Sequence, residues 1–188
     1  IVKDRNHVRA IEKNVFWPDI HPKIQDKGYT VIGFWENGVR HITNSKRPID
    51  KPSDLKGLKI RTPKSTWRVK MFKAWGSSPT PMAFNEVFTA LQTGVIDGQE
   101  NPYTNVDGAK FQEVQKFLSK TGHVYTPAYL TAGKDTFSKL PKDVQNILKN
   151  AAEDVRGRMY KTAEEGEVSL EKKLVAGGMK LNVANKAA

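Results

Sequence analysis

The sequence predicts an α/β protein in which helices cover both faces of a sheet. Amphipathic segments with helical spacing alternate with short apolar or period-two segments, and this alternation is typical of α/β folds. A helical pattern that runs from Pro141 to about Ala176 predicts one unusually long helix. The 38% of hydrophobic and 27% of charged residues agree with a packed core and argue against wholesale disorder.

The first quarter of the chain is expected to hold a broken helix, a strand and a loop. Residues 8–27 have the pattern of a helix, interrupted by two prolines and ended by Gly28. Residues 29–35 are almost wholly apolar, which predicts a strand covered on both faces. Residues 36–52 begin with a turn signal, contain a short extended piece and end in a proline-bounded loop.

The next strand carries the first candidate site residue. Leu58 and Ile60 alternate with basic residues in the period-two pattern of a strand. Arg61 stands at the end of this strand, and Ser65 has the position of an N-cap for a helix over 66–75. A guanidinium at that place is either paired with a carboxylate of its own chain or available to one from outside.

The second half of the chain continues the alternation. Residues 79–83 predict a short strand, 84–94 a second amphipathic helix, and 95–102 a strand that enters a turn. A helical turn and then extended chain over 124–130 precede the long helix. The expected buried face of the long helix is formed by Val144, Ile147, Leu148, Ala151, Val155, Met159 and Ala163.

Composition limits the classes of function. The chain has no cysteine, so disulfides, thiolate zinc sites and cysteine nucleophiles are excluded. No apolar run approaches the roughly 20 residues that span a bilayer, so we expect no stable membrane insertion. The chain begins at Ile1 without Met or an apolar leader, which we interpret as a processed product or a fragment.

The net charge of +11 has three interpretations. The basic residues are scattered along the sequence. They either lie on solvated helix faces or together produce an electrostatic field that attracts small anions. Binding of nucleic acid ranks last, because no dense basic arm is present.

The densest polar cluster, residues 97–102, admits two interpretations. Asp97 and Glu100 suggest acid/base catalysis or a metal site, but no histidine lies near them in sequence. We favour a turn at Asp97 and Gly98, with the Asn101 amide offered to a ligand or to the backbone. The spacing of the four histidines matches no metal-binding motif, and the sequence contains no phosphate-loop or nucleophile-elbow motif. We therefore expect no metal, no cofactor and no catalytic residue. The histidines are His7, His21, His41 and His123.

Arg40 and Arg61 are the candidates for anion capture, because a guanidinium matches a carboxylate edge to edge. Arg61 and Asn101 both follow a strand and precede a proline, and ligands of α/β sheets bind at the carboxyl ends of strands. Each arginine is equally suited to a structural ion pair. Trp35 and Phe84 are either walls of the pocket or plain core.

Several separated motifs resemble those of the solute-binding proteins of TRAP transporters, the DctP-like family, in the same order and with near-family spacing. These motifs are "GVRHITNSKRPI", "DLKGLKIRTP", "GSSPTPMAFNEVFTALQTGVIDGQENP" and "FQEVQKFLSKTGHV". The resemblance extends over nearly the whole chain. It implies two α/β lobes around a cleft, with strands that cross between the lobes and a long helix that spans both.

The resemblance also implies an organisation into segments. Residues 1–37 would be a remnant of the first lobe with a crossing strand, 38–125 the second α/β lobe, and 126–188 the return strand and the spanning helix. Family members extend beyond both ends of this sequence. We therefore expect that the chain lacks the N-terminal part and a C-terminal tail.

Four site residues follow from the family motifs. Arg61, in "KIRTP", would form the main salt bridge to the carboxylate of the substrate. Arg40, in "GxR", would make a second or water-mediated contact. Phe84, after "PMA", would pack against the ligand, and Asn101, in "QENP", would hydrogen-bond the same carboxylate.

The resemblance implies a periplasmic, non-enzymatic protein that captures a small organic acid and delivers it to TRAP membrane permease subunits. A C4-dicarboxylate, a sugar acid, a keto acid and an aromatic acid stay open as substrates. The alternative is an enzyme that acts on small organic acids with Asp97 or Glu100 as its base.

Overall fold

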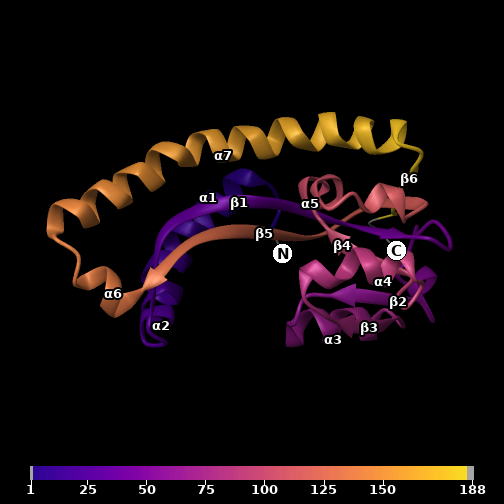
Figure 1. Cartoon of the computed structure of the whole chain (residues 1–188), viewed down its shortest axis with the longest axis horizontal. Coiled ribbons are helices and arrows are strands. Elements are labelled where there is room, and N and C mark those ends of the chain that lie inside the picture. The colour runs from indigo at the N-terminus through magenta and orange to yellow at the C-terminus, as the bar shows by residue number, and fades with distance from the viewer. Residues whose placement is uncertain (1, 186–188) are drawn as a thin grey trace. The chain divides into compact units, whose positions relative to one another are not determined.

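The computed structural model describes residues 2–185, which fall into two compact units. The first unit comprises residues 1–37 and 124–165, and the second comprises residues 38–123 and 166–188. Two long strands and one long helix contribute residues to both units (Figure 1). These are β1 (Tyr29–Asn44), β5 (Phe117–Gly133) and α7 (Lys142–Ala176).

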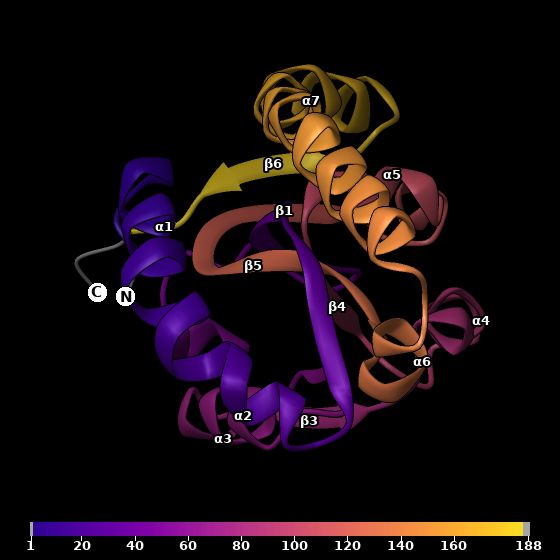
Figure 2. The same ribbon diagram turned by 90° about the vertical axis from the view of Figure 1, so that its left-hand side faces the viewer.

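The first unit begins with a helical rod (Figure 2). The rod consists of α1 (Arg5–Ile11), a π-helical segment (Glu12–Ile20) and α2 (His21–Gln25). Asp4 caps α1, since its carboxylate accepts the backbone N–H of His7 at 2.8 Å. The prolines do not end the rod, and Pro18 lies inside the π-helical segment. The core of this unit contains Val8, Phe16, Val31 and Phe34.

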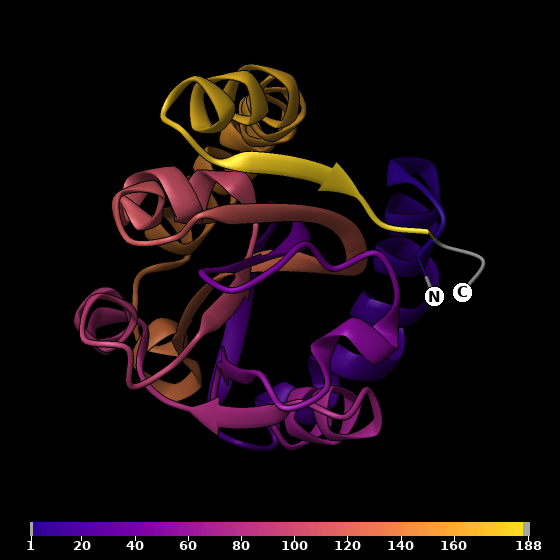
Figure 3. The ribbon, with the colours of Figure 1, turned by 90° about the vertical axis from the view of Figure 1, so that its right-hand side faces the viewer.

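The second unit contains a six-stranded mixed sheet in the order β3-β2-β4-β1-β5-β6. The shorter strands are β2 (Lys59–Thr62), β3 (Ser78–Pro81), β4 (Gly98–Asn101) and β6 (Lys180–Val183). β2 runs parallel to both β3 and β4, whereas β1 runs antiparallel to β4. β6 lies beside β5 and parallel to it (Figure 3).

Helices α3 (Thr66–Ala74), α4 (Val87–Gln92) and α5 (Tyr103–Gly108) pack in the second unit, and α6 (Lys134–Ser138) belongs to the first. As predicted, Ser65 caps α3, because its hydroxyl accepts the N–H of Arg68. One apolar cluster of the second unit contains Ile42, Ile49, Leu55, Leu58, Ile60 and Phe72. The other contains Val87, Leu91, Ile96, Tyr103, Val106, Phe111, Leu118, Leu174 and Met179.

The turn expected at residues 36–38 is wrong, because β1 continues through it. Glu36 is 3% exposed and accepts two hydrogen bonds from Arg5, while residues 41–44 pair with β4. Gly38 keeps the strand continuous at a φ of 131°, a conformation that glycine tolerates. Tertiary pairing at both ends therefore overrides the local turn signal. The extended chain expected over 124–130 is likewise part of a longer strand, β5.

The long helix is confirmed, but part of its expected buried face is wrong. Ile147 and Leu148 are 63% and 39% exposed. The buried positions of α7 in the first unit are Gln145, Ala152 and Tyr160, an adjacent stripe at helical spacing. The amide of Gln145 donates to the carbonyl groups of Ser138 and Leu140, which satisfies this polar group in its buried position.

Candidate functional site

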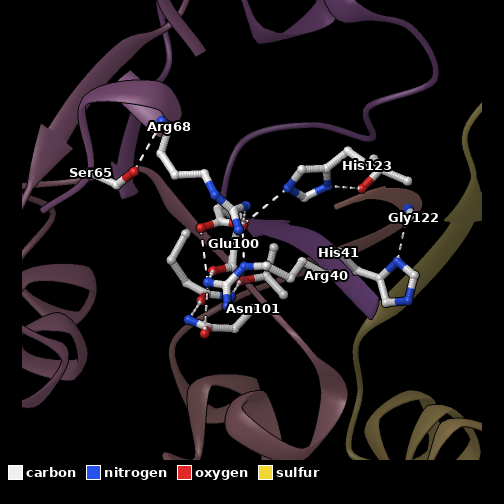
Figure 4. A network of polar contacts seen from close by, with 11 residues as sticks. Arg40, His41, Ser65, Arg68, Glu100, Asn101, Gly122 and His123 are labelled. Atoms are coloured by element: carbon white, nitrogen blue, oxygen red, sulfur yellow. Dashed lines mark hydrogen bonds and ion pairs between the residues drawn. The ribbon is translucent and has the colours of Figure 1, made fainter. Parts of the chain in front are cut away.

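A buried carboxylate, Glu100, lies at the centre of a polar cluster in the second unit (Figure 4). Nε and Nη2 of Arg40 lie 2.5 Å and 2.9 Å from its two oxygens. Nη1 of Arg68 lies 3.0 Å from Oε2, and Nε2 of His123 lies 3.1 Å from the same oxygen. We call Arg40, Arg68, Glu100, Asn101 and His123 the Glu100 cluster.

The sheet register explains how distant residues meet in this cluster. Glu100 on β4 lies opposite Ile42 on β1, so Arg40 is two residues along β1 from that pairing. Arg68 lies in the first turn of α3, whose start Ser65 fixes, and β5 contributes His123. Four elements therefore meet at one carboxylate.

The environment sets the protonation of Glu100 and His123. Burial opposes ionisation of Glu100, but hydrogen bonds from His123 and Arg40 hold the pKa of its carboxyl below the ordinary value. Burial lowers the pKa of His123, although its hydrogen bond to Glu100 opposes that change. Nδ1 of His123 lies 2.7 Å from the Thr121 hydroxyl. A neutral imidazole that donates through Nε2 and accepts through Nδ1 satisfies both contacts.

Asn101 extends the cluster along β4. Its Oδ1 accepts a hydrogen bond from Nη2 of Arg40 at 2.9 Å, and its Nδ2 donates to Oε1 of Gln99 at 2.6 Å. Gln99 in turn donates to Thr43 on β1. The orientation of the Asn101 amide is thus fixed by the protein, which leaves one N–H free of these contacts.

Arg61 is the guanidinium of this region that lacks an acidic partner within residues 2–185. It is 4% exposed and lies on β2 opposite Gln99. Its Nε and Nη2 donate to the backbone carbonyl of Met82 at 3.1 Å and 2.8 Å. The ring of Phe84 lies 5.8 Å from its guanidinium carbon. A carbonyl orients the guanidinium but does not neutralise it.

The charges of the region do not balance. Arg40, Arg61 and Arg68 carry three positive charges; the buried Glu100 carries one negative charge, and the exposed Glu86 also acts on Arg61. Burial lowers the pKa of Arg61 and of Arg68, and the field of Arg40 adds to this change. Glu100 opposes it at both residues, and Glu86 opposes it at Arg61. A buried cation without a counterion is unfavourable, so the arrangement favours an added anion.

The predicted site residues fall into two contact pairs and one separate residue. Arg40 contacts Asn101, and Arg61 lies against Phe84, which is 43% exposed. Trp35 belongs to the first unit, where its Nε1–H donates to the carbonyl of Ala152 at 2.9 Å. The roles of these five residues toward a ligand stay predictions.

Asp97 has a structural position instead of the expected turn. Its Oδ2 accepts the backbone N–H of Lys59 at 2.8 Å, which joins the starts of β2 and β4. Together with the occupied oxygens and low pKa of Glu100, this leaves neither carboxylate suited to act as a base.

Sequence reasoning missed Arg68 and His123. Arg68 is separated from Glu100 by 32 residues and His123 by 23, so no local pattern connects them. The one available signal for Arg68 was its place in the first turn after Ser65. Over residues 2–185, no group of three or more His, Asp or Glu residues is arranged to hold a metal ion. In the same range, no helix is long and apolar enough to cross a membrane.

Comparison with known proteins gives a consistent result. The model of the family described as "Bacterial extracellular solute-binding protein, family 7" (DctP) matches residues 1–188. The 2,3-diketo-L-gulonate-binding periplasmic protein YiaO of Escherichia coli is 40% identical over 167 residues, 89% of this chain and 51% of its own length. The chain spans about half the length of the curated relatives it matches.

Two solved structures are similar over almost the whole chain. A TRAP periplasmic solute-binding protein of Roseobacter denitrificans with bound L-galactonate has a TM-score of 0.94 and 37% identity, covering 99% of this chain and 62% of its own. One of Polaromonas with bound D-erythronate has a TM-score of 0.92 and 39% identity, covering 98% and 61%.

Proposed function

Because the chain belongs to family 7 of the bacterial extracellular solute-binding proteins, we propose that the protein captures a small organic acid in the periplasm for a TRAP-type permease. The family consists of binding proteins and not of enzymes. The enzymatic alternative is therefore dropped, in agreement with the occupied carboxylates of Asp97 and Glu100.

The relatives suggest the class of ligand. L-galactonate, D-erythronate and 2,3-diketo-L-gulonate, named for three of them, are carboxylates on an oxygen-rich carbon chain. We propose a sugar acid of this kind as the ligand of the present protein. The permease partner follows from membership of the family alone.

One observation carries the proposal: Arg61 is buried, and no carboxylate of residues 2–185 forms an ion pair or a hydrogen bond with it. Its bonds to Met82 fix the plane of the guanidinium. A ligand carboxylate can accept paired N–H groups from such a fork, and this contact is stronger in a dry site than in water. Asn101 and Arg40 would support the same carboxylate, and Phe84 would pack against the carbon chain.

The proposal is tested by isothermal titration calorimetry, which measures the affinity for L-galactonate. The purified protein should contain any flanking sequence that its gene encodes. Arg61→Ala should weaken binding by about 2–5 kcal/mol, since it leaves the charge of the ligand unpaired. Arg61→Lys should also weaken binding, because an ammonium group cannot reproduce the fork. Arg158→Ala, which removes an exposed arginine, is the matched control.

Equal affinity of Arg61→Ala and Arg158→Ala would contradict the proposal. Recovery of chemically unchanged L-galactonate after prolonged incubation separates a binding protein from an enzyme.

A further inference from the structure

We propose that the exposed face of helix α3 binds reversibly to a membrane surface that carries anionic phospholipids. Such binding goes beyond the capture of an organic acid and does not depend on which acid is bound. It would keep the protein beside the membrane that holds its proposed permease. The basis is an uneven distribution of charge in this part of the second unit.

The segment that contains α3 carries positive charges only. Residues 55–85 include seven basic residues and no acidic one, whereas the whole chain has 31 basic and 20 acidic residues. Arg61 is buried, and Arg68 is bonded to the buried Glu100. The other five basic residues are exposed lysines, and none of them forms a salt bridge within residues 2–185. They are Lys56, Lys59, Lys64, Lys70 and Lys73.

The packing of α3 turns two of these lysines to the same side of the helix. Phe72 is fully buried, and Trp75 packs against the same apolar cluster. Trp67, Lys70 and Lys73 follow one another at intervals of three residues and are exposed, so they lie on the opposite side. α3 packs beside β2 and β3, and β3 is an edge strand of the sheet (Figure 1).

Two further lysines lie at the two ends of α3. Lys64 directly precedes Ser65, the residue that caps the helix. At the other end, a Cβ atom added to Gly76 would lie 3.6 Å from Cα of Lys56, which places Lys56 beside the end of the helix. We call Trp67 and the lysines 56, 64, 70 and 73 the α3 face.

Trp67 distinguishes this face from an ordinary solvated helix surface. Its side chain is 77% exposed, although tryptophan is highly buried on average in folded proteins. Nζ of Lys70 lies 5.0 Å from the centre of its ring. Lysines alone are expected on a solvated face, but a tryptophan placed among them is typical of a membrane interface. There the indole ring lies at the level of the lipid headgroups.

The type of cation favours lipid over an acidic protein surface. The exposed cations of the α3 face are all lysines, and lysine is depleted at protein–protein interfaces, where arginine is enriched. A flexible lysine stem lets the ammonium group follow the diffuse charge of a lipid surface. Each basic residue near such a surface strengthens binding by about fivefold, and salt screens this attraction.

The test is co-sedimentation of the whole protein with vesicles. One set contains equal parts of phosphatidylglycerol and phosphatidylcholine, and the other contains phosphatidylcholine alone. The protein should sediment with the anionic vesicles only, and it should be released when the salt concentration is raised from about 0.05 M to about 0.5 M.

Variants locate the contact on the molecule. The pair Lys70→Gln and Lys73→Gln should weaken vesicle binding at least about tenfold, and Trp67→Ala should weaken it by about tenfold. The pair Lys172→Gln and Lys180→Gln is the matched control, since it removes the same net charge from exposed positions of the second unit. The control pair should weaken binding by less than about threefold.

Fluorescence gives a second readout of the same contact. The tryptophan emission of the unaltered protein should shift to shorter wavelength on addition of anionic vesicles, and Trp67→Phe should abolish the shift. All replaced side chains are exposed, so thermal melts of the variants should match that of the unaltered protein.

Three results would overturn the inference. They are no binding to the anionic vesicles at low salt, equal weakening by the two lysine pairs, and a fluorescence shift that persists in Trp67→Phe. Equal weakening would mean that net charge alone attracts the protein to lipid. Capture of L-galactonate is measured without vesicles, so it stands or fails separately.

Discussion

Nε of Arg40 lies 2.5 Å from Oε2 of Glu100, and the two side chains are only 6% and 0% exposed. Arg40 is therefore already neutralised by its own chain. Of the two arginines that the sequence singled out, Arg61 alone retains a buried charge without an acidic partner in residues 2–185. This difference between two similar residues determines which one we expect to hold the ligand.

Removal of the Glu100 charge should destabilise the protein strongly. Glu100→Gln leaves the guanidinium groups of Arg40 and Arg68 buried without a counterion, and loss of one partner of a buried pair costs about 3–5 kcal/mol. Urea denaturation measures the free energy of unfolding. Glu153→Gln is the control, since Glu153 is 71% exposed in its pair with Arg156 and should contribute less than about 1 kcal/mol. A similar small loss for both variants would contradict the central place of Glu100.

Acidification from pH 7 to pH 5 should destabilise the protein in part through His123. Burial lowers the pKa of His123 in the folded state, whereas an unfolded histidine titrates near pH 6.5. The unfolded chain therefore binds the proton first, and the stability present above about pH 6.5 is lost as the pH falls through this window.

Replacement of His123 by glutamine should reduce the slope of stability against pH in that window. Burial also lowers the pKa of His21 in the first unit, so some slope should persist in His123→Gln, and His21→Gln is the companion variant. NMR titration of the His123 ring checks the cause directly. A midpoint above pH 6.5 for the folded protein would refute this explanation.

Gly98 should tolerate no side chain. A Cβ atom there would lie 2.3 Å from the carbonyl oxygen of Thr43 and 2.7 Å from Cβ of Asn44, on the neighbouring strand β1. Because the first of these atoms is backbone, β1 and β4 would have to separate, and overpacking of this kind costs about 1–3 kcal/mol or more.

Gly157→Ala is the matched control for Gly98→Ala. Gly157 lies inside α7, and an added Cβ there meets no atom within 4 Å. Alanine should stabilise the helix by up to about 1 kcal/mol. Equal thermal stability of the two variants would show that β1 and β4 approach less closely than described.

The sequence predicted those features that depend on neighbouring residues. The Ser65 cap of α3 and the length of α7 follow from local hydrogen bonding and helical periodicity, and both are confirmed. The turn expected at 36–38 was wrong because pairing of β1 with distant segments decides its conformation. Ile147 and Leu148 were placed in the core because periodicity cannot distinguish adjacent stripes of one helix.

For the candidate site, as for the fold, only features that depend on neighbouring residues were predictable from the sequence. Arg61 and Asn101 were chosen because each was expected just after a strand; they lie within β2 and β4, and their role toward a ligand stays a prediction. The contact of Arg68 and His123 with Glu100 was not predictable, since the sheet brings them together from positions 32 and 23 residues away. Arg40 is neutralised by Glu100, which is 60 residues away in sequence, so the charge balance of the region could be judged only from the structure.

The most direct test is a crystal structure of the protein, with any flanking sequence that its gene encodes, at saturating L-galactonate. We expect the ligand carboxylate to lie within hydrogen-bonding distance of the Arg61 guanidinium while Glu100 stays paired with Arg40. A bound acid whose carboxylate is held elsewhere, with Arg61 bonded only to the carbonyl of Met82, would contradict it.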